Sequence, residues 1–173
     1  MNNLKLIAPT TEFKAEFLEM LTEWEKTGEE LIPWVLEFDT SDFPAIIKKL
    51  RGFEQGIGLQ EGYVNHSTYW LINGENKILG AVNIRHKLNE DLLKSGGHIG
   101  YGIRPSERKK GYATEALRLS LEIAKEFGIH KALLTCDKKN IGSAKTIQKH
   151  HGILESEELY NGKMLQRYWI YID

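Results

Sequence analysis

The segment 103–114 combines residue types that bind an anionic group. Three cations, Arg108, Lys109 and Lys110, directly precede Gly111, after which apolar spacing predicts a helix. The first backbone N–H groups of a helix have no partner within the helix and carry the positive end of its dipole. Gly111 would let a ligand approach the backbone closely, and an arginine holds phosphate oxygens in pairs. The segment therefore predicts a phosphate or pyrophosphate site.

The pattern R-x-x-G-x-A of residues 108–113 is short, and many helices begin with basic residues and a glycine by chance. Neither the dinucleotide-binding pattern G-x-G-x-x-G nor the P-loop pattern G-x-x-x-x-G-K-S/T occurs in the sequence. The surroundings of the segment support the site. A strand is predicted directly before it, over 98–103, and a second polar motif, 137–143, follows the next predicted strand.

Hydrophobic spacing predicts the elements that position these motifs. Turn residues at 73–76 and 161–162 indicate two hairpins, and the glycine-containing stretch 55–67 is expected to form a loop that faces the substrate. The expected elements are strand 3–7, a helix from Thr10 or Thr11 to Lys26, a helix that begins at Ser41 or Asp42, strands 68–72 and 78–86, helix 89–94, strand 98–103, helix 111–127, strand 131–136, helix 143–149, and strands 153–160 and 163–172. This order predicts an α/β fold with a mixed, mostly antiparallel sheet of about six to seven strands and helices on both faces.

Length and composition are those of one globular domain, 1–173. No apolar run is long enough for a membrane span, and the first nine residues lack the pattern of a signal peptide. Cys136 is the only cysteine, so no internal disulfide forms. We therefore expect a cytoplasmic protein without membrane association.

The charges are distributed unevenly along the chain. Residues 1–61 carry 12 acidic and 6 basic side chains, and residues 62–173 carry 12 acidic and 17 basic ones. This balance does not indicate a nucleic-acid-binding protein, which usually has a clearly basic domain. It suits a protein that holds a polyanion at one end and a cation at the other, although charges on a solvated surface would give the same count.

Two motifs together resemble a known family. Arg108-Lys-Lys-Gly-Tyr-Ala113 resembles the Q/R-x-x-G-x-G/A pyrophosphate loop of the Gcn-related N-acetyltransferase (GNAT) superfamily. The segment 137–143 with Lys149 and Gly152 resembles the downstream motif of the same family. The longer strings 67–70, 83–86 and 96–108 are similar to a bacterial subgroup known only as predicted acetyltransferases. The resemblance covers nearly the whole chain and is most specific over 97–153.

The resemblance implies acetyl-CoA as cosubstrate and no metal. Strand 98–103 would pair its edge with the pantetheine arm, and Ile103 and Arg104 would supply backbone groups near the thioester. Asn140 and Ser143 would contact the same arm, although an asparagine before a helix is equally typical of an N-cap. The residues implied at the pyrophosphate are Arg108, Lys109, Lys110, Gly111, Tyr112, Ala113 and Thr114.

The implied reaction is direct attack of a neutral amine on the acetyl-CoA carbonyl, in a ternary complex. It needs a donor for the oxyanion, a route for the amine proton and a proton for the leaving thiolate. Many relatives carry a tyrosine acid where this chain has Ile147, so Tyr101 or a water is the candidate acid. His98 and His86 are candidate bases, because histidine titrates near neutral pH. Strand alternation places His98 on the same face as Gly100 and Gly102, which would leave its ring room beside the cofactor. A hydrogen bond from His98 to a core carbonyl is the structural alternative.

We therefore expect an N-acetyltransferase that acts on a small-molecule or peptide amine, and we allow for a homodimer. An alternative hypothesis is an acyl-CoA-binding sensor or partner protein without catalysis, since Ile147 stands where an acid is often found. A third hypothesis is that residues 108–114 bind another phosphate, such as a nucleotide.

Overall fold

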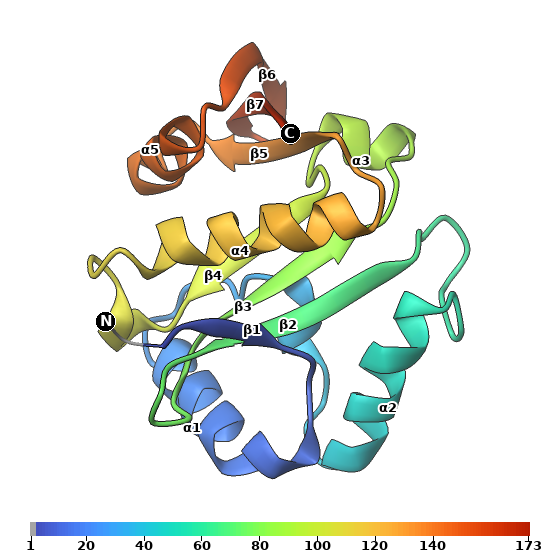
Figure 1. Cartoon of the computed structure of the whole chain (residues 1–173), viewed down its shortest axis with the longest axis vertical. Coiled ribbons are helices and arrows are strands. Elements are labelled where there is room, and N and C mark those ends of the chain that lie inside the picture. The colour runs from blue at the N-terminus through green and yellow to red at the C-terminus, as the bar shows by residue number, and fades with distance from the viewer. Residues whose placement is uncertain (1–2) are drawn as a thin grey trace.

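The computed structural model describes residues 3–173, so the first two residues of the predicted domain lie outside it. A four-stranded antiparallel sheet forms the centre of the molecule, with the strand order β1-β2-β3-β4 (Figure 1). Its strands are β1 (Lys5–Ile7), β2 (His66–Ile72), β3 (Ile78–Arg85) and β4 (Ile99–Ile103). A second, three-stranded antiparallel sheet has the order β5-β7-β6 and consists of β5 (Lys131–Asp137), β6 (Ile153–Tyr160) and β7 (Lys163–Tyr171).

The two sheets meet near the beginning of β4. Gly97 and Leu134 form an isolated β-bridge, and the N–H of His98 donates to the carbonyl of Leu133 at 2.7 Å. No further ladder pairing between β4 and β5 occurs among residues 3–173. The two strands therefore separate toward their carboxyl ends, beside the start of the longest helix.

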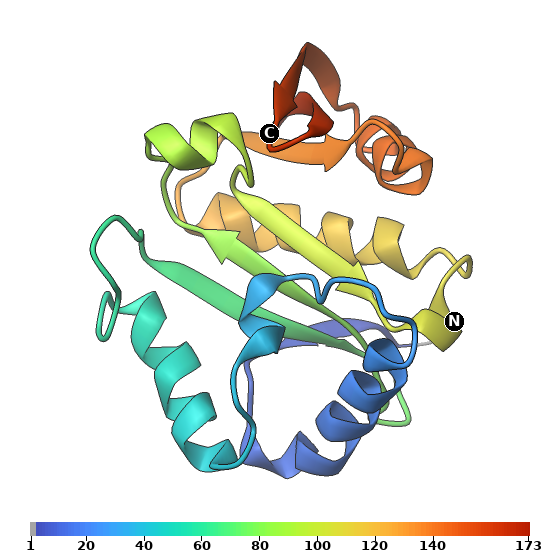
Figure 2. The same ribbon diagram turned by 180° about the vertical axis from the view of Figure 1, so that it is seen from behind.

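Helices cover both faces of the first sheet. Figure 1 shows α4 lying across one face, and Figure 2 shows the connection between α1 and α2 crossing the other face in front of β4. α5 packs beside β5. The helices are α1 (Lys14–Glu25), α2 (Phe43–Glu54), α3 (Glu90–Lys94), α4 (Tyr112–Glu126) and α5 (Ile141–Lys149), with the 3-10 turns η1 (Thr11–Phe13), η2 (Trp34–Glu37) and η3 (Pro105–Glu107).

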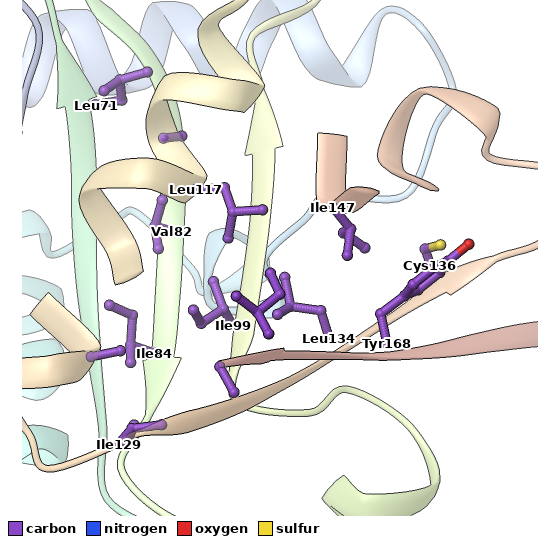
Figure 3. Packing of buried hydrophobic residues seen from close by; sticks show 14 of the residues in the cluster. Leu71, Val82, Ile84, Ile99, Leu117, Ile129, Leu134, Cys136, Ile147 and Tyr168 are labelled. Carbon is purple, nitrogen blue, oxygen red and sulfur yellow. The ribbon is translucent and has the colours of Figure 1, made fainter. Parts of the chain in front are cut away.

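The core follows from the alternation of side chains along the strands. On β2, Trp70 and Ile72 pack with residues of α1 and α2, whereas Leu71 faces the opposite side and joins the cluster under α4. Figure 3 shows this second cluster, in which Leu117 of α4 lies near strand residues from both sheets. Both faces of the first sheet are therefore buried, which fixes β4 rigidly between α4 and the α1–α2 connection.

The predicted α/β class and the mostly antiparallel strand pairing are confirmed. The strands form two sheets instead of one continuous sheet, and β2 begins at His66, inside the stretch that was predicted as a loop. His66 and Ser67 are polar but buried. Each has one side-chain partner from the neighbouring strand region: Asn83 contacts His66 Nδ1 and His86 Nε2 contacts Ser67 Oγ, both at 2.8 Å. No helix among the described residues is long and apolar enough to span a membrane.

Candidate cofactor site

A cavity of about 680 Å³ lies where β4 and β5 separate. Three parts of the chain form its wall: the segment after α1, the carboxyl end of β4 with the loop into α4, and the start of α5. The lining residues are Trp24, Glu29, Glu30, Ile32, Tyr101, Gly102, Ile103, Glu107, Arg108, Lys109, Gly111, Tyr112, Ala113, Thr114, Asn140, Gly142, Ser143 and Thr146. The cavity therefore brings together most of the residues that the two sequence motifs predict.

The start of α4 lies at one end of this cavity. Gly111 occupies the N-cap position with φ of 85°, a left-handed conformation, and no side chain caps the helix. A Cβ atom placed at Gly111 would meet nothing within 4 Å, so the turn is open, and Gly111 lines the cavity. The uncapped helix start carries the positive end of the α4 dipole. It has the geometry and the charge to hold a diphosphate.

The three cations of the loop have different surroundings. Arg108 lies at the cavity wall, where its Nε donates to the Ile103 carbonyl at 3.1 Å and its guanidinium pairs with Glu29 at 2.7 Å. This hydrogen bond lowers the pKa of the Glu29 carboxyl. Lys109 also lines the cavity, whereas Lys110 pairs with Glu107 at 2.9 Å and is not among the lining residues.

The start of α5 forms the opposite wall. Asn140 Oδ1 accepts a hydrogen bond from the Ser143 N–H at 3.1 Å, so Asn140 is the N-cap of α5 and also lines the cavity. The Ser143 hydroxyl lies 3.2 Å from the Tyr101 hydroxyl of β4. Burial raises the pKa of Tyr101 to about 12. Its hydroxyl therefore keeps its proton at neutral pH and is available as a donor.

His98 lies outside the cavity lining, contrary to the interpretation that it stands beside the cofactor. Its Nδ1 accepts a hydrogen bond from the Leu133 N–H at 2.9 Å, and the residue is 7% exposed. Burial, together with the charge of Arg85, lowers the pKa of His98 to about 4. The ring is therefore neutral and joins the two sheets. The glycines on the same strand face leave it no room, because Gly100 lies under Arg85 and Gly102 lies against Ile32.

Arg104 and His86 also turn away from the cavity. The Arg104 side chain is 2% exposed and pairs with three glutamates of α1, Glu16, Glu19 and Glu23. Its backbone N–H donates to Leu79 within the sheet. Since this pairing fixes the end of β4 to α1, the side chain of Arg104 contributes to the cavity only by positioning the strand. His86 binds Ser67 and stacks on Phe127 at a centroid distance of 4.1 Å.

Sequence reasoning missed the wall that the segment after α1 provides. Trp24, Glu29, Glu30 and Ile32 belong to no motif, and the acidic character of residues 1–61 was the only signal that pointed to this part of the chain. Thr146, one turn into α5 from Ser143, was also missed.

Comparison with known proteins agrees with this geometry. The family described as acetyltransferase (GNAT) domain matches residues 3–152, so the chain belongs to the GNAT acetyltransferase family. In sequence it is 38% identical over 80 residues to YnaD, an uncharacterized N-acetyltransferase of Bacillus subtilis (strain 168). That match spans 46% of this chain and 45% of the relative, a little under half of each protein.

Solved structures share the fold at low sequence identity. RimL, a ribosomal L7/L12 α-N-protein acetyltransferase in complex with coenzyme A, has a TM-score of 0.71 and 18% identity, covering 98% of this chain and 94% of that one. A dodecameric spermidine N-acetyltransferase from Vibrio cholerae has a TM-score of 0.64 and 14% identity, covering 97% and 93%. These two structures show the fold and not the acceptor.

Proposed function

We propose that this protein transfers the acetyl group of acetyl-CoA to a primary amine by direct attack. The observation that carries the proposal is the uncapped, open start of α4 in a cavity of about 680 Å³, in a chain of the GNAT family. The complex of RimL with coenzyme A supports coenzyme A as the ligand of this fold. The acceptor classes of the two neighbours, a protein N-terminus and a polyamine, support an amine acceptor.

The cavity residues divide the binding of acetyl-CoA between two ends. The backbone of residues 109–114 would hold the diphosphate, with Arg108 and Lys109 adding positive charge. The pantetheine arm would follow the gap between β4 and β5, past Gly102 and toward Ser143. Arg108 would release Glu29 when its guanidinium turns from the Ile103 carbonyl to the phosphate oxygens, and the Glu29 carboxylate would stay beside the end of β4.

Tyr101 is the proposed general acid. Its hydroxyl lines the cavity, bonds to the Ser143 hydroxyl and keeps its proton at neutral pH. It would donate this proton to the thiolate that leaves as the amide bond forms. Ile147 is buried and offers no proton, so the tyrosine reaches the cavity from β4 instead of from α5.

Glu29 and Glu30 are the proposed acceptors for the amine proton. No histidine is among the described residues that line the cavity, whereas both of these glutamates are. Glu29 pairs with Arg108, and Glu30 lies 3.9 Å from Lys163. A water between the amine and a carboxylate would carry the proton.

The test is incubation of the protein with acetyl-CoA and a panel of primary amines, with thiol release monitored and acetylated product identified by mass. Turnover on at least one amine, and none without protein, is the expected result. Binding of acetyl-CoA without transfer to any amine would instead support the sensor hypothesis. The homodimer stays a prediction that analytical ultracentrifugation checks, and the cytoplasmic location stays a prediction as well.

A further inference from the structure

A second cavity, of about 320 Å³, lies at the other end of β4. One of its walls is Trp34, which belongs to the connection between α1 and α2 that crosses a face of the first sheet in Figure 2. Its walls include Trp34 of η2, Tyr63, His66 of β2, Arg85 of β3, Asp91 of α3 and Gly96. None of these residues belongs to the motifs that predict the cofactor site.

Arg85 has few partners for a half-buried arginine. Its NH1 donates to the Gly96 carbonyl at 3.3 Å, and it forms no ion pair with any residue of 3–173. Arg104, by contrast, is buried with three carboxylates around it. A guanidinium has five N–H donors, and removing it from water without an opposite charge is unfavourable. Burial lowers the pKa of Arg85 to about 10, so it remains charged at neutral pH.

The guanidinium lies over Gly100 of β4. A Cβ atom built at Gly100 would stand 3.2 Å from Arg85 NH1. Gly100 and Gly102 lie on the same face of β4, and two residues along a strand correspond to about 7 Å. Gly102 lines the cofactor cavity. A molecule that contacts Arg85 would therefore lie about 7 Å along β4 from the wall of the cofactor cavity.

The other polar groups of this cavity do not neutralise Arg85. Asp91 is exposed and forms no ion pair among the described residues. His66 is 3% exposed, and burial lowers its pKa to about 4, so it is neutral. Its Nδ1 contacts the Asn83 amide, and its Nε2 has no hydrogen-bond partner in the described chain. Arg85 is thus the one cation among the described residues that line this cavity.

We infer that Arg85 binds an oxyanion of the acceptor, a carboxylate or a phosphate, and that the substrate is a primary amine carrying such a group. This inference rests on the proposed acetyl transfer. The acceptor is then zwitterionic: its anion pairs with Arg85, and its ammonium group lies on the side of Glu29 and Glu30, which remove the proton. A planar guanidinium with free donors matches a carboxylate or phosphate in a two-point geometry.

Turnover with matched acceptors tests the inference. The carboxylate probes are ω-amino acids spanning about 7 Å between nitrogen and carboxylate, each paired with its methyl ester. The phosphate probe is an aminoalkyl phosphonate of similar length, paired with its diester. We expect the anionic member of each pair to have the higher kcat/KM. The anion type that gives the higher kcat/KM, carboxylate or phosphonate, shows which group the natural acceptor carries. A preference for the uncharged members would overturn the inference.

Variants separate recognition from structural support. Arg85→Gln is expected to lower kcat/KM for the anionic acceptor by about 10- to 100-fold and for the uncharged one by less than about threefold. Arg85→Lys keeps the positive charge but not the planar guanidinium. Its kcat/KM for the anionic acceptor should lie between those of the wild type and Arg85→Gln. Lys87→Gln removes an exposed cation two residues away and should change kcat/KM for neither acceptor. An equal loss on both acceptors with Arg85→Gln would mean that Arg85 only supports the fold, and would overturn the inference.

A binding measurement decides the anion site even if no amine is acetylated. Glutarate and inorganic phosphate are titrated separately into CoA-saturated protein, and the arginine Nε–Hε signals are followed by NMR. The Arg85 signal is assigned by its absence in Arg85→Gln. A saturable shift of this signal with either anion is expected. Absence of a shift with both anions would overturn the anion site, whereas absence of turnover alone would overturn the proposed acetyl transfer.

Discussion

Two helices begin at the cofactor cavity, and their first turns differ. α5 begins with Asn140, whose side chain accepts from the Ser143 N–H and so satisfies the helix start from within the protein. α4 begins with Gly111, which has no side chain to cap it and leaves open space on the cavity side. Both helix starts carry a positive dipole end, but only that of α4 is left uncapped for a ligand. The difference supports the proposal that the diphosphate binds at α4, whereas the first turn of α5 is already satisfied by its own cap.

The largest effect is expected at the uncapped helix. Gly111→Asp places a carboxylate where the diphosphate would bind, and also strains a residue with φ of 85°. We expect the affinity for CoA to fall by about 100-fold or more, about 2.7 kcal/mol, measured by calorimetry. Gly128→Asp is the control, since Gly128 ends the same helix with φ of 79° and equally open surroundings. Equal losses in the two variants would remove the α4 start from the cofactor site.

The next effect concerns the proton that Tyr101 would supply. Tyr101→Phe should lower kcat by about 10- to 100-fold and leave CoA affinity within about threefold. Because the pKa of Tyr101 is raised to about 12, wild-type activity should not lose its acid near pH 10, where an ordinary tyrosine would titrate. A normal kcat in the phenylalanine variant at all pH values would leave the thiolate to be protonated by water.

His98 should affect stability and not turnover. Its pKa is lowered to about 4 in the folded protein, so the unfolded state binds the proton first as the pH falls from 6.5. The free energy of unfolding should therefore decrease between pH 6.5 and 4, by at most about 1.4 kcal/mol per pH unit for this ring. His66 has a similarly lowered pKa and contributes its own slope. Urea unfolding of His98→Gln should show a shallower decrease than the wild type, and a kcat that follows the pH dependence of His98 would contradict the structural role.

The smallest effect is expected at the capped helix. Asn140→Ala should lower the free energy of unfolding by about 1 kcal/mol, the usual cost of losing an N-cap. Asn140→Ser, which can still cap, should retain most of the stability. Asn140→Ala should reduce the affinity for CoA far less than Gly111→Asp does in the same calorimetric measurement. An affinity loss as large as that of Gly111→Asp would mean that the start of α5 also binds the cofactor strongly.

Local patterns in the sequence predicted most of the fold. The helix after Gly111 and the hairpin across Asn161-Gly162 form almost within the predicted bounds, because apolar spacing and turn residues act over a few positions. The extension of β2 to His66 was not predictable in this way. It depends on Asn83 and His86, which lie 17 and 19 residues away and contact polar groups that local reasoning assigns to a loop.

The sequence predicted the loop before α4, but it did not predict the other walls of the two cavities. The loop residues 108–114 are contiguous, so they form a motif that can be recognised in the sequence. The wall from Trp24 to Ile32 and the position of Arg85 depend on how α1 and β3 pack against β4. For His98, strand alternation gave the correct face, but it could not show that Arg85 and Ile32 already occupy the space above the two glycines.

The central claim is that the main chain at the start of α4 holds the diphosphate of coenzyme A. Backbone amide shifts of Gly111 and Ala113, recorded by NMR with coenzyme A and with pantetheine, test it most directly, because pantetheine lacks the diphosphate. Large shifts of both amides with coenzyme A and small ones with pantetheine are predicted. Amides that stay unchanged with saturating coenzyme A, or that move equally with both ligands, would contradict the account.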